Sequence, residues 1–399
     1  MNAPGLAAPA RSSLAVRLRG LLWTLAESVV AILLAVVLGG IGIFLFSGLL
    51  PNHSAFDLGL PVAAYGALWS GAVTYPRGVG STLAYATPLV LAGLGVGLGF
   101  KAGLFNIGGR GQFLMGVIGA MAVVTFVGQS LPGFATIALA LIAAAIFGGF
   151  AGFIPGALKA TSGAHEVVTT IMLNYIFVFV TYWAISGPLR LPHSPQPITV
   201  DVSTRGAALG TMTIFGVDLF GPNAHWGVLL AVLGIPLLWF LLYRTTLGFE
   251  IRAAGANSDA ARYAGMKTRQ LVVLTMSLSG ALCGLAGATT LLGVVHQIAP
   301  GYDTTIGFDA ITVALLGRSN PIGIALAGLL LGGMRAGSQS MQISPGVPGE
   351  LVDALQAIIL LFLVINLLRR WRATRHVGAP TVAPAEPYGL AAVPAEVAK

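Results

Sequence analysis

The sequence predicts an all-α, polytopic membrane protein with about ten transmembrane helices and cytoplasmic N and C termini. Of its 399 residues, 56% are hydrophobic and only 9% are charged, and the mean hydropathy is +0.87. A soluble domain of this length does not have such a composition. Apolar runs close to the roughly 20 residues that a membrane helix needs recur along the chain. Lysine and arginine fall mostly on one side of the resulting topology, which we take as the cytoplasm.

The net charge of +8 is also found in proteins that bind nucleic acid. Here the cations are scattered at the ends of apolar runs and form no single patch, so we interpret them as topology signals and expect no nucleic-acid partner. The one cysteine, Cys283, lies within an apolar run. This excludes an intrachain disulfide and a cysteine metal cluster.

The N-terminal half is predicted to contain five membrane helices after a cytoplasmic tail at residues 1–20. The first apolar run is too long for a cleaved signal peptide, and no small-residue cleavage site follows it. The turn-rich, amphipathic stretch at residues 51–80 suits the outer membrane interface. The five helices are expected at residues 28–50, 83–100, 113–129, 134–158 and 167–185.

The C-terminal half is predicted to contain five more helices, which follow an outer loop at residues 187–224. Residues 244–270 form the most charged inner segment, and we expect most of it to be helical and cytoplasmic. The transmembrane domain spans residues 21–368, and the Pro/Ala-rich tail at 369–399 is expected to be disordered in the cytoplasm. The five helices are expected at residues 226–243, 271–292, 307–316, 322–336 and 351–368.

Two interruptions break the apolar pattern: a Gly-rich one at residues 106–112 and a Gly/Pro one at residues 317–321. Freed backbone groups cannot face lipid, so such a break lies at a membrane surface or is buried in protein beside a watery cavity. Two interrupted segments near the centre of a bundle are typical of a substrate pathway. The candidate pathway residues are Asn106, Gln112, Asn174 and Asn320.

Alternatives stay open for these side chains. Asn106 and Gln112 are also suited to capping helix ends at the cytoplasmic surface. Asn174, two turns into its helix, is equally suited to a hydrogen bond between helices.

Four segments resemble motifs of a known protein family: GLFNIGGRGQ (103–112), EVVTTIMLNY (166–175), TTLGFEIRAAGANSDAARYAGM (245–266) and GFDAITVALLGRSNPIGI (307–324). In this order and spacing they resemble the permease subunits of ABC importers of the branched-chain amino acid, ribose and nucleoside group. The resemblance covers residues 80–365 and is greatest to the longer permease of simple-sugar and nucleoside importers. Such relatives often carry an acidic residue where Arg110 stands, which leaves the role of this position open.

The resemblance implies an importer of a small neutral polar solute, a nucleoside or else a simple sugar, in a bacterial inner membrane. It implies three protein partners: a cytoplasmic ABC ATPase that binds ATP and Mg, a shorter homologous permease that forms a heterodimer with this chain, and an extracytoplasmic solute-binding protein. The chain has no GxxxxGK[ST] phosphate loop. We therefore expect no cofactor in this chain and no enzymatic activity of its own.

Residues 245–266 resemble the part of such permeases that docks on the ATPase. A cytoplasmic helix rich in small residues can lie closely in the groove of a partner, with charged side chains at the rim. An ordinary positive-inside loop is the alternative reading. The candidate docking residues are Glu250, Arg252, Ala254, Asn257, Ala261, Arg262 and Gly265.

Two other classes of function are less favoured. An ion-coupled secondary transporter predicts paired acids deep in the spans, whereas Asp303 and Asp309 are expected near an outer helix end, where solvated carboxylates are common. An intramembrane enzyme predicts a nucleophile with its base, or a metal site. The six histidines lie in separate segments without the spacing of metal ligands. We therefore expect neither catalytic residues nor a metal site.

Overall fold

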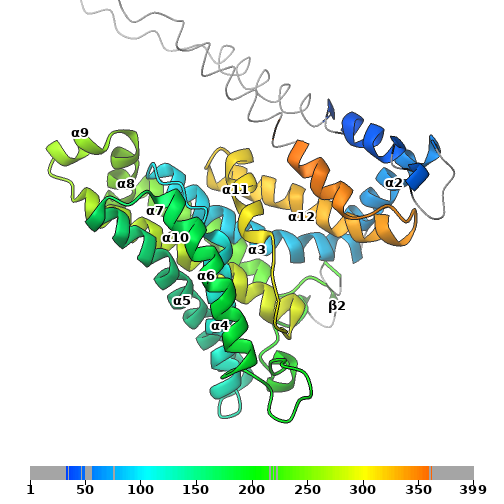
Figure 1. Cartoon of the computed structure of the whole chain (residues 1–399), viewed down its shortest axis with the longest axis horizontal. Coiled ribbons are helices and arrows are strands. Elements are labelled where there is room, and N and C mark those ends of the chain that lie inside the picture. Colours follow the sequence, from blue (N-terminus) through cyan, green and yellow to red (C-terminus); the bar gives the residue numbers. More distant parts are fainter. Residues whose placement is uncertain are drawn as a thin grey trace, which may run out of the picture. The chain divides into compact units, whose positions relative to one another are not determined.

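The computed structural model describes residues 33–34, 36–45, 47–49, 56–74, 77–214, 217–218, 220–221, 223–358 and 361. Residues 36–356 belong to one compact unit, which is a bundle of helices (Figure 1). Seven of the described helices are long and apolar enough to cross a membrane. They are α3 (Arg77–Lys101), α4 (Gly109–Phe126), α5 (Gly133–Ser162), α6 (Glu166–Ser186), α7 (Gly227–Arg244), α10 (Thr268–Thr290) with its π-helical extension η3 (Leu291–Val295), and α12 (Pro321–Ile343).

The remaining elements are short. An apolar helical stretch covers Val36–Leu45, and residues 350–358 are helical. The others are η1 (Ser47–Leu49), α2 (Gly59–Val73), η2 (Val202–Arg205), a hairpin of β1 (Thr213–Ile214) and β2 (Val217–Asp218), α8 (Thr246–Ala256), α9 (Ser258–Tyr263) and α11 (Ile306–Leu316).

These elements confirm the predicted all-α membrane class. Seven of the ten predicted spans correspond to the seven long helices, and an eighth corresponds to the short helix α11. The first and last predicted helices lie partly outside the described residues, and both predicted tails lie wholly outside them. The count of ten and the side of the termini therefore stay predictions.

One prediction was wrong. The stretch at residues 51–80 was expected to be turn-rich, but Gly59–Val73 forms the helix α2, which packs against α12 and α3. Pro61 does not break this helix because it lies in the first turn, where its missing N–H has no intrahelical partner to lose.

The core of the bundle is made by α3, α4 and α10. Buried residues make up 83% of the most apolar stretch of α3 and 72% of that of α4, against 28% for α7. The peripheral helices instead expose large side chains such as Phe150 on α5 and Leu237 on α7. This distribution suits a bundle whose outer helices face lipid.

Small residues let the central helices approach closely. Gly148 and Gly152 on α5 meet Gly280 and Gly284 on α10, where an added Cβ would overlap the opposite backbone. Such small-residue contacts are the usual basis of helix packing in membranes. The GxxxG spacings Gly148–Gly152 and Gly280–Gly284 therefore act as packing motifs.

The second interruption separates α11 from α12. Arg318 and Ser319 have positive φ angles of 53° and 51°, so the chain reverses direction directly after α11. The Asn320 side chain then accepts a hydrogen bond of 3.1 Å from the Ile322 N–H at the start of α12. With 11 residues, α11 is about 16 Å long and therefore a half-helix, too short to cross a bilayer.

Candidate substrate pathway and docking surface

The first interruption folds into a buried cluster of amide side chains. Asn106 donates to the Gln112 Oε1 atom at 2.9 Å and to the Ser279 hydroxyl at 2.8 Å. Its own Oδ1 atom accepts from the Gly108 N–H at 2.9 Å. Asn106 is 0% exposed and Gln112 is 1% exposed. Since Ser279 lies midway along α10, the interruption is inside the bundle.

Asn174 on α6 completes this cluster. Its Oδ1 atom accepts from the Gly111 N–H at 2.8 Å, and its Nδ2 atom donates to the Ile107 carbonyl at 2.9 Å. It thus satisfies backbone groups that the interruption frees, and it makes the interhelical hydrogen bonds that were one of its two predicted roles.

Asn320 lies apart from the cluster. It is exposed at the start of α12, where it acts as a helix cap. The structure thus brings together Asn106, Gln112 and Asn174 but not Asn320. Their role in a solute pathway stays a prediction, and for the three clustered residues it would require the cluster to open.

Two ion pairs surround the half-helix α11, and the sequence did not reveal them. Arg110 at the start of α4 binds both carboxylate oxygens of Asp303, and its guanidinium lies 5.8 Å from the Phe308 ring centroid. Arg335 of α12 binds Asp309 at 2.8 Å. The acids expected to be solvated helix ends are therefore partners of arginines, and Asp303 gives Arg110 a role in holding the chain before α11.

The predicted docking segment forms two short helices, α8 and α9, next to the C-terminal end of α3 and the N-terminal end of α10 (Figure 1). Thr245 caps α8 by accepting from the Gly248 N–H at 3.0 Å. Asn257 caps α9 by accepting from two backbone N–H groups at 3.0 Å. The local sequence therefore explains the break between the two helices.

The candidate docking residues differ in what they offer to a partner. Asn257, Arg262 and Gly265 are exposed, whereas Glu250, Arg252 and Ala254 are half-buried. Arg252 lies 5.0 Å from the Tyr243 ring centroid, so its guanidinium is partly engaged within the chain. Ala261 is only 2% exposed, so its small side chain packs within this chain in this conformation, and its docking role stays a prediction.

Two exposed aromatic residues on this segment were missed. Tyr263 at the end of α9 is 93% exposed and Phe249 on α8 is 57% exposed. A hollow of about 390 Å³ between α9 and α10 is lined by Arg262, Lys267 and Arg269, among others. Large apolar side chains exposed next to cations are typical of a protein interface, and this exposure was not readable from the sequence.

The opposite end of the bundle contains a cavity of about 420 Å³. Its walls come from the start of α3, the loop between α6 and α7, η3 and the end of α12. Its polar lining residues are Ser81, Tyr85, Thr211, Asn223, His225, His296 and Gln339. These residues come from separate parts of the chain, so no local motif could have predicted the cavity. Within the described residues, no cluster of histidine, cysteine and carboxylate side chains forms a metal site.

Comparison with known proteins adds a second line of evidence. Residues 78–364 match the family described as the permease component of the branched-chain amino acid transport system. The chain is 42% identical to the guanosine ABC transporter permease protein NupP of Bacillus subtilis, over 77% of this chain and 87% of NupP.

Other relatives are named as permeases for nucleosides or for glucose. The nucleoside ABC transporter permease protein NupB of Lactococcus lactis is 34% identical, over 77% of this chain and 85% of NupB. The glucose ABC transporter permease protein TsgB13 of Haloferax volcanii is 33% identical, over 78% of this chain and 83% of TsgB13. A second guanosine permease of B. subtilis, NupQ, is 28% identical over 64% of this chain and 79% of NupQ.

Proposed function

The chain belongs to the family of branched-chain amino acid transport permease components, and from this membership we propose that it is the membrane-spanning subunit of an ABC importer for nucleosides or simple sugars. The observation that carries the proposal is the 42% identity to a guanosine permease over 77% of the chain. The seven membrane-capable helices fit a multi-pass protein of the inner membrane. Nucleosides are the first candidates because NupP and NupB, the two relatives with the highest identities reported above, are both nucleoside permeases by name.

A separate ATPase supplies the energy in this proposal and binds ATP and Mg itself. The α8–α9 segment is its docking surface. Tyr263 and Phe249 are exposed there, and the basic hollow between α9 and α10 suits an acidic side chain of the partner. Exposed aromatic anchors of this kind carry most of the binding energy in many interfaces.

Two further partners complete the importer. A solute-binding protein delivers the solute from the extracytoplasmic side, opposite to α8–α9. A second, shorter permease forms a heterodimer with this chain. The similarity of the chain to both NupP and NupQ, two guanosine permease proteins of one bacterium, supports a pair of related but different permeases.

An ion-coupled secondary transporter is less well supported. Proton relays need carboxylates that can exchange protons within the membrane. Asp309 on α11 instead binds Arg335 at 2.8 Å, and Asp303 binds Arg110 with both oxygens. Both carboxylates are thus engaged in ion pairs within this chain.

The test is transport by the reconstituted importer. Proteoliposomes would contain this chain, the second permease and the ATPase, with the binding protein added outside. We expect ATP-dependent uptake of a radiolabelled nucleoside or sugar from a panel of both. Uptake that follows a proton or sodium gradient without ATP would overturn the proposal.

A further inference from the structure

The cavity at the end of the bundle opposite to α8–α9 is a built feature of the fold. Main-chain hydrogen bonds fix its walls: the Leu209 N–H donates to the Leu292 carbonyl at 2.7 Å, and the Trp226 N–H donates to the Gly210 carbonyl at 3.1 Å. Thr211 and His225 form an antiparallel bridge. The loop between α6 and α7 is thereby held against the end of α10.

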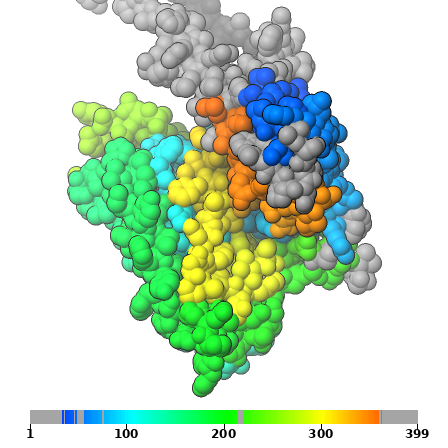
Figure 2. Space-filling view, turned by 45° about the vertical axis from the view of Figure 1, so that its right-hand side comes forward, coloured from blue at the N-terminus to red at the C-terminus, as the bar shows by residue number. Residues whose placement is uncertain are grey.

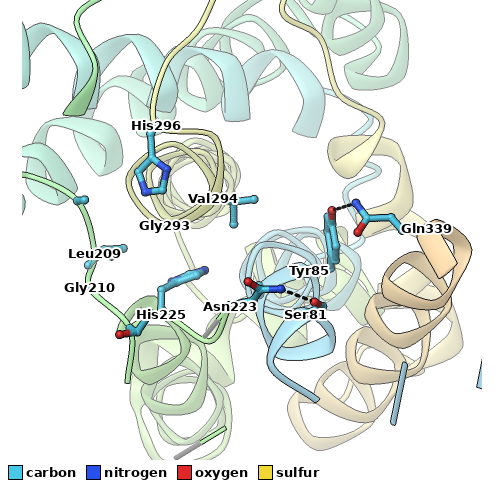
Figure 3. Close-up of a pocket in the computed structure, with 13 residues that line it drawn as sticks. Ser81, Tyr85, Leu209, Gly210, Asn223, His225, Gly293, Val294, His296 and Gln339 are labelled. Carbon is cyan, nitrogen blue, oxygen red and sulfur yellow. Dashed lines mark hydrogen bonds between the residues drawn. The ribbon is translucent and has the colours of Figure 1, made fainter. Parts of the chain in front are cut away.

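Two hydrogen-bonded pairs of polar side chains line the cavity (Figure 3). Gln339 on α12 donates to the Tyr85 hydroxyl on α3 at 2.7 Å. Asn223 donates to the Ser81 hydroxyl at 2.7 Å. Each acceptor hydroxyl keeps its own proton, and each amide keeps a carbonyl oxygen. The cavity therefore presents both donors and acceptors to a bound molecule.

His225 adds a group without a partner. Its Nδ1 atom accepts from the Gly227 N–H at 3.1 Å, so in the neutral ring the proton is on Nε2. Among the described residues, the Nε2 atom has no hydrogen-bond partner although the histidine is 2% exposed. Figure 3 shows this end of the ring pointing towards the space between Asn223 and Val294. A buried donor without a partner is unfavourable, so a ligand acceptor that reaches it would stabilise the ring in this position.

The π-helical turn η3 packs against the His225 ring and fixes its position. A Cβ added at Gly293 would lie 2.6 Å from the His225 ring, so only a glycine lets the ring lie flat against this turn. π-Helical turns within α-helices are frequent at functional sites.

The lining indicates which ligand would fit. None of its 13 residues is an aspartate, glutamate, lysine or arginine. The volume of about 420 Å³ is within the range of small-molecule sites, about 300–1,000 Å³. Uncharged donors and acceptors beside Ala84 and Leu209 suit a neutral solute with several hydroxyl groups, since each hydroxyl both donates and accepts.

We propose that this cavity receives the imported solute on the extracytoplasmic side, and that the ligand is a neutral, hydroxyl-rich molecule of nucleoside or monosaccharide size. The proposal rests on the function proposed above. A groove of about 520 Å³ shares Ser81, Asn223 and Gln339 with the cavity, so the cavity has a polar approach along α2, α3 and α12.

The first test fills the cavity. Gly210 lines it, and an added Cβ there meets no atom within 4 Å, so Gly210→Phe adds a ring without a backbone clash. Uptake by the complete complex should fall about tenfold or more, because occupied volume excludes the solute. Gly210→Ala is the conservative variant. Gly66→Phe is the matched control, since Gly66 is on α2 outside the cavity and its Cβ position is also open.

The second test measures occupancy directly. Cys283 is the only cysteine and is buried, so Ser81→Cys in a Cys283→Ser background introduces one thiol in the cavity. A solute that the native complex imports should slow its alkylation by a maleimide about tenfold at ten times the half-saturating concentration. The thiol introduced by Ser70→Cys on α2, which lines the outer groove but not the cavity, should be protected much less.

The outcomes separate this inference from the proposed function. Native complex that imports no nucleoside or sugar refutes the proposed function. Native complex that imports a solute, while Gly210→Phe keeps the native rate or the Ser81→Cys thiol is not protected by that solute, refutes the cavity as the receiving site.

Discussion

Asn106 donates a hydrogen bond of 2.8 Å to the Ser279 hydroxyl, although the two residues are 173 positions apart. This bond fixes the interruption before α4 to the middle of α10. Because Asn106 also binds Gln112 and the Gly108 N–H, the interruption is closed by its own side chains in this conformation. A structural role and a solute-lining role of this cluster therefore predict different effects of substitutions.

Replacement of Asn106 by leucine should destabilise the permease strongly. The change leaves the Gln112 amide, the Gly108 N–H and the Ser279 hydroxyl with fewer partners in a buried place. Each unsatisfied group costs about 1–3 kcal/mol. The unfolding midpoint in detergent should fall clearly, and Ser279→Ala, which removes one bond, should have a smaller effect. An unchanged midpoint in Asn106→Leu would contradict this.

Gln112→Leu separates the two roles of the cluster. The buried bond of Gln112 with Asn106 is lost in either case, so the unfolding midpoint should fall in either case. A solute-lining Gln112 predicts in addition that uptake per folded complex falls by a factor corresponding to about 1–3 kcal/mol, with ATPase assembly retained. A purely structural corner predicts native uptake per folded complex. Uptake in proteoliposomes, beside thermal unfolding of the same preparation, decides between them. A native rate in both Asn106→Leu and Gln112→Leu would place the cluster outside the pathway.

The ion pair before α11 should respond to charge exchange. Arg110→Asp sets two carboxylates against each other, and the double variant with Asp303→Arg restores an opposite pair. The native side chains are 19% and 45% exposed, so the loss from either single change is of the order of 1 kcal/mol. Uptake and unfolding midpoint should fall in each single variant and recover in the double variant. Failure of the double variant to recover would argue against the pair.

The sequence was sufficient for the features that depend on local composition. Hydropathy placed the seven long helices, and glycine with proline marked both interruptions. The helix α2 was missed because Pro61, Tyr65 and Trp69 resemble an interface loop in composition. The structure shows this stretch as a helix that packs against α12.

Side-chain pairs between distant positions could not be predicted from the sequence. Arg110 and Asp303 are 193 positions apart, and Tyr85 and Gln339 are 254 apart. Nothing in the local pattern specifies such partners. The same reason explains Ala261, whose small side chain suited a docking surface by composition but is buried within the chain.

The docking surface should depend on exposed aromatic side chains. Tyr263→Ser, or Phe249→Ser, should reduce ATPase affinity by about 2 kcal/mol or more, as loss of an interface anchor does. The unfolding midpoint of the permease should not change. Copurification of the ATPase measures the effect, and Phe134→Ser, an exposed position at the start of α5, is the matched control. Undiminished copurification in both aromatic variants would refute the surface.

Ala261→Leu provides a contrast within the same segment. The added volume has no space in a position that is 2% exposed, so the variant should lose about 1–3 kcal/mol of permease stability. Loss of the ATPase should then accompany loss of folded permease. A stable variant that has lost only the ATPase would restore Ala261 to the docking surface.

Permease stability should fall at acid pH because of His225, which lies in the loop before α7. Burial, and then the nearby His296, lowers the pKa of His225 from 6.5 to about 4. The folded state favours the neutral ring, so this contribution is complete above pH 6.5 and is lost as the pH falls towards 4. Between pH 7 and pH 5 the loss is at most about 2 kcal/mol. Thermal unfolding at both pH values should show a smaller decrease for His225→Gln than for the native chain; equal decreases would contradict the prediction.

The last prediction concerns the second permease. In this chain α3, α4 and α10 meet at closely packed small residues such as Gly116 and Gly284, so the centre of the bundle is filled by protein. A solute pathway therefore needs the surface of a second permease, which is shorter and different from this chain in the proposed heterodimer. Proteoliposomes with this chain and the ATPase alone should show no increase in ATP hydrolysis when solute-loaded binding protein is added. Addition of the second permease should restore the increase, and binding protein without solute is the control. Full stimulation by this chain and the ATPase alone would establish a homodimer instead.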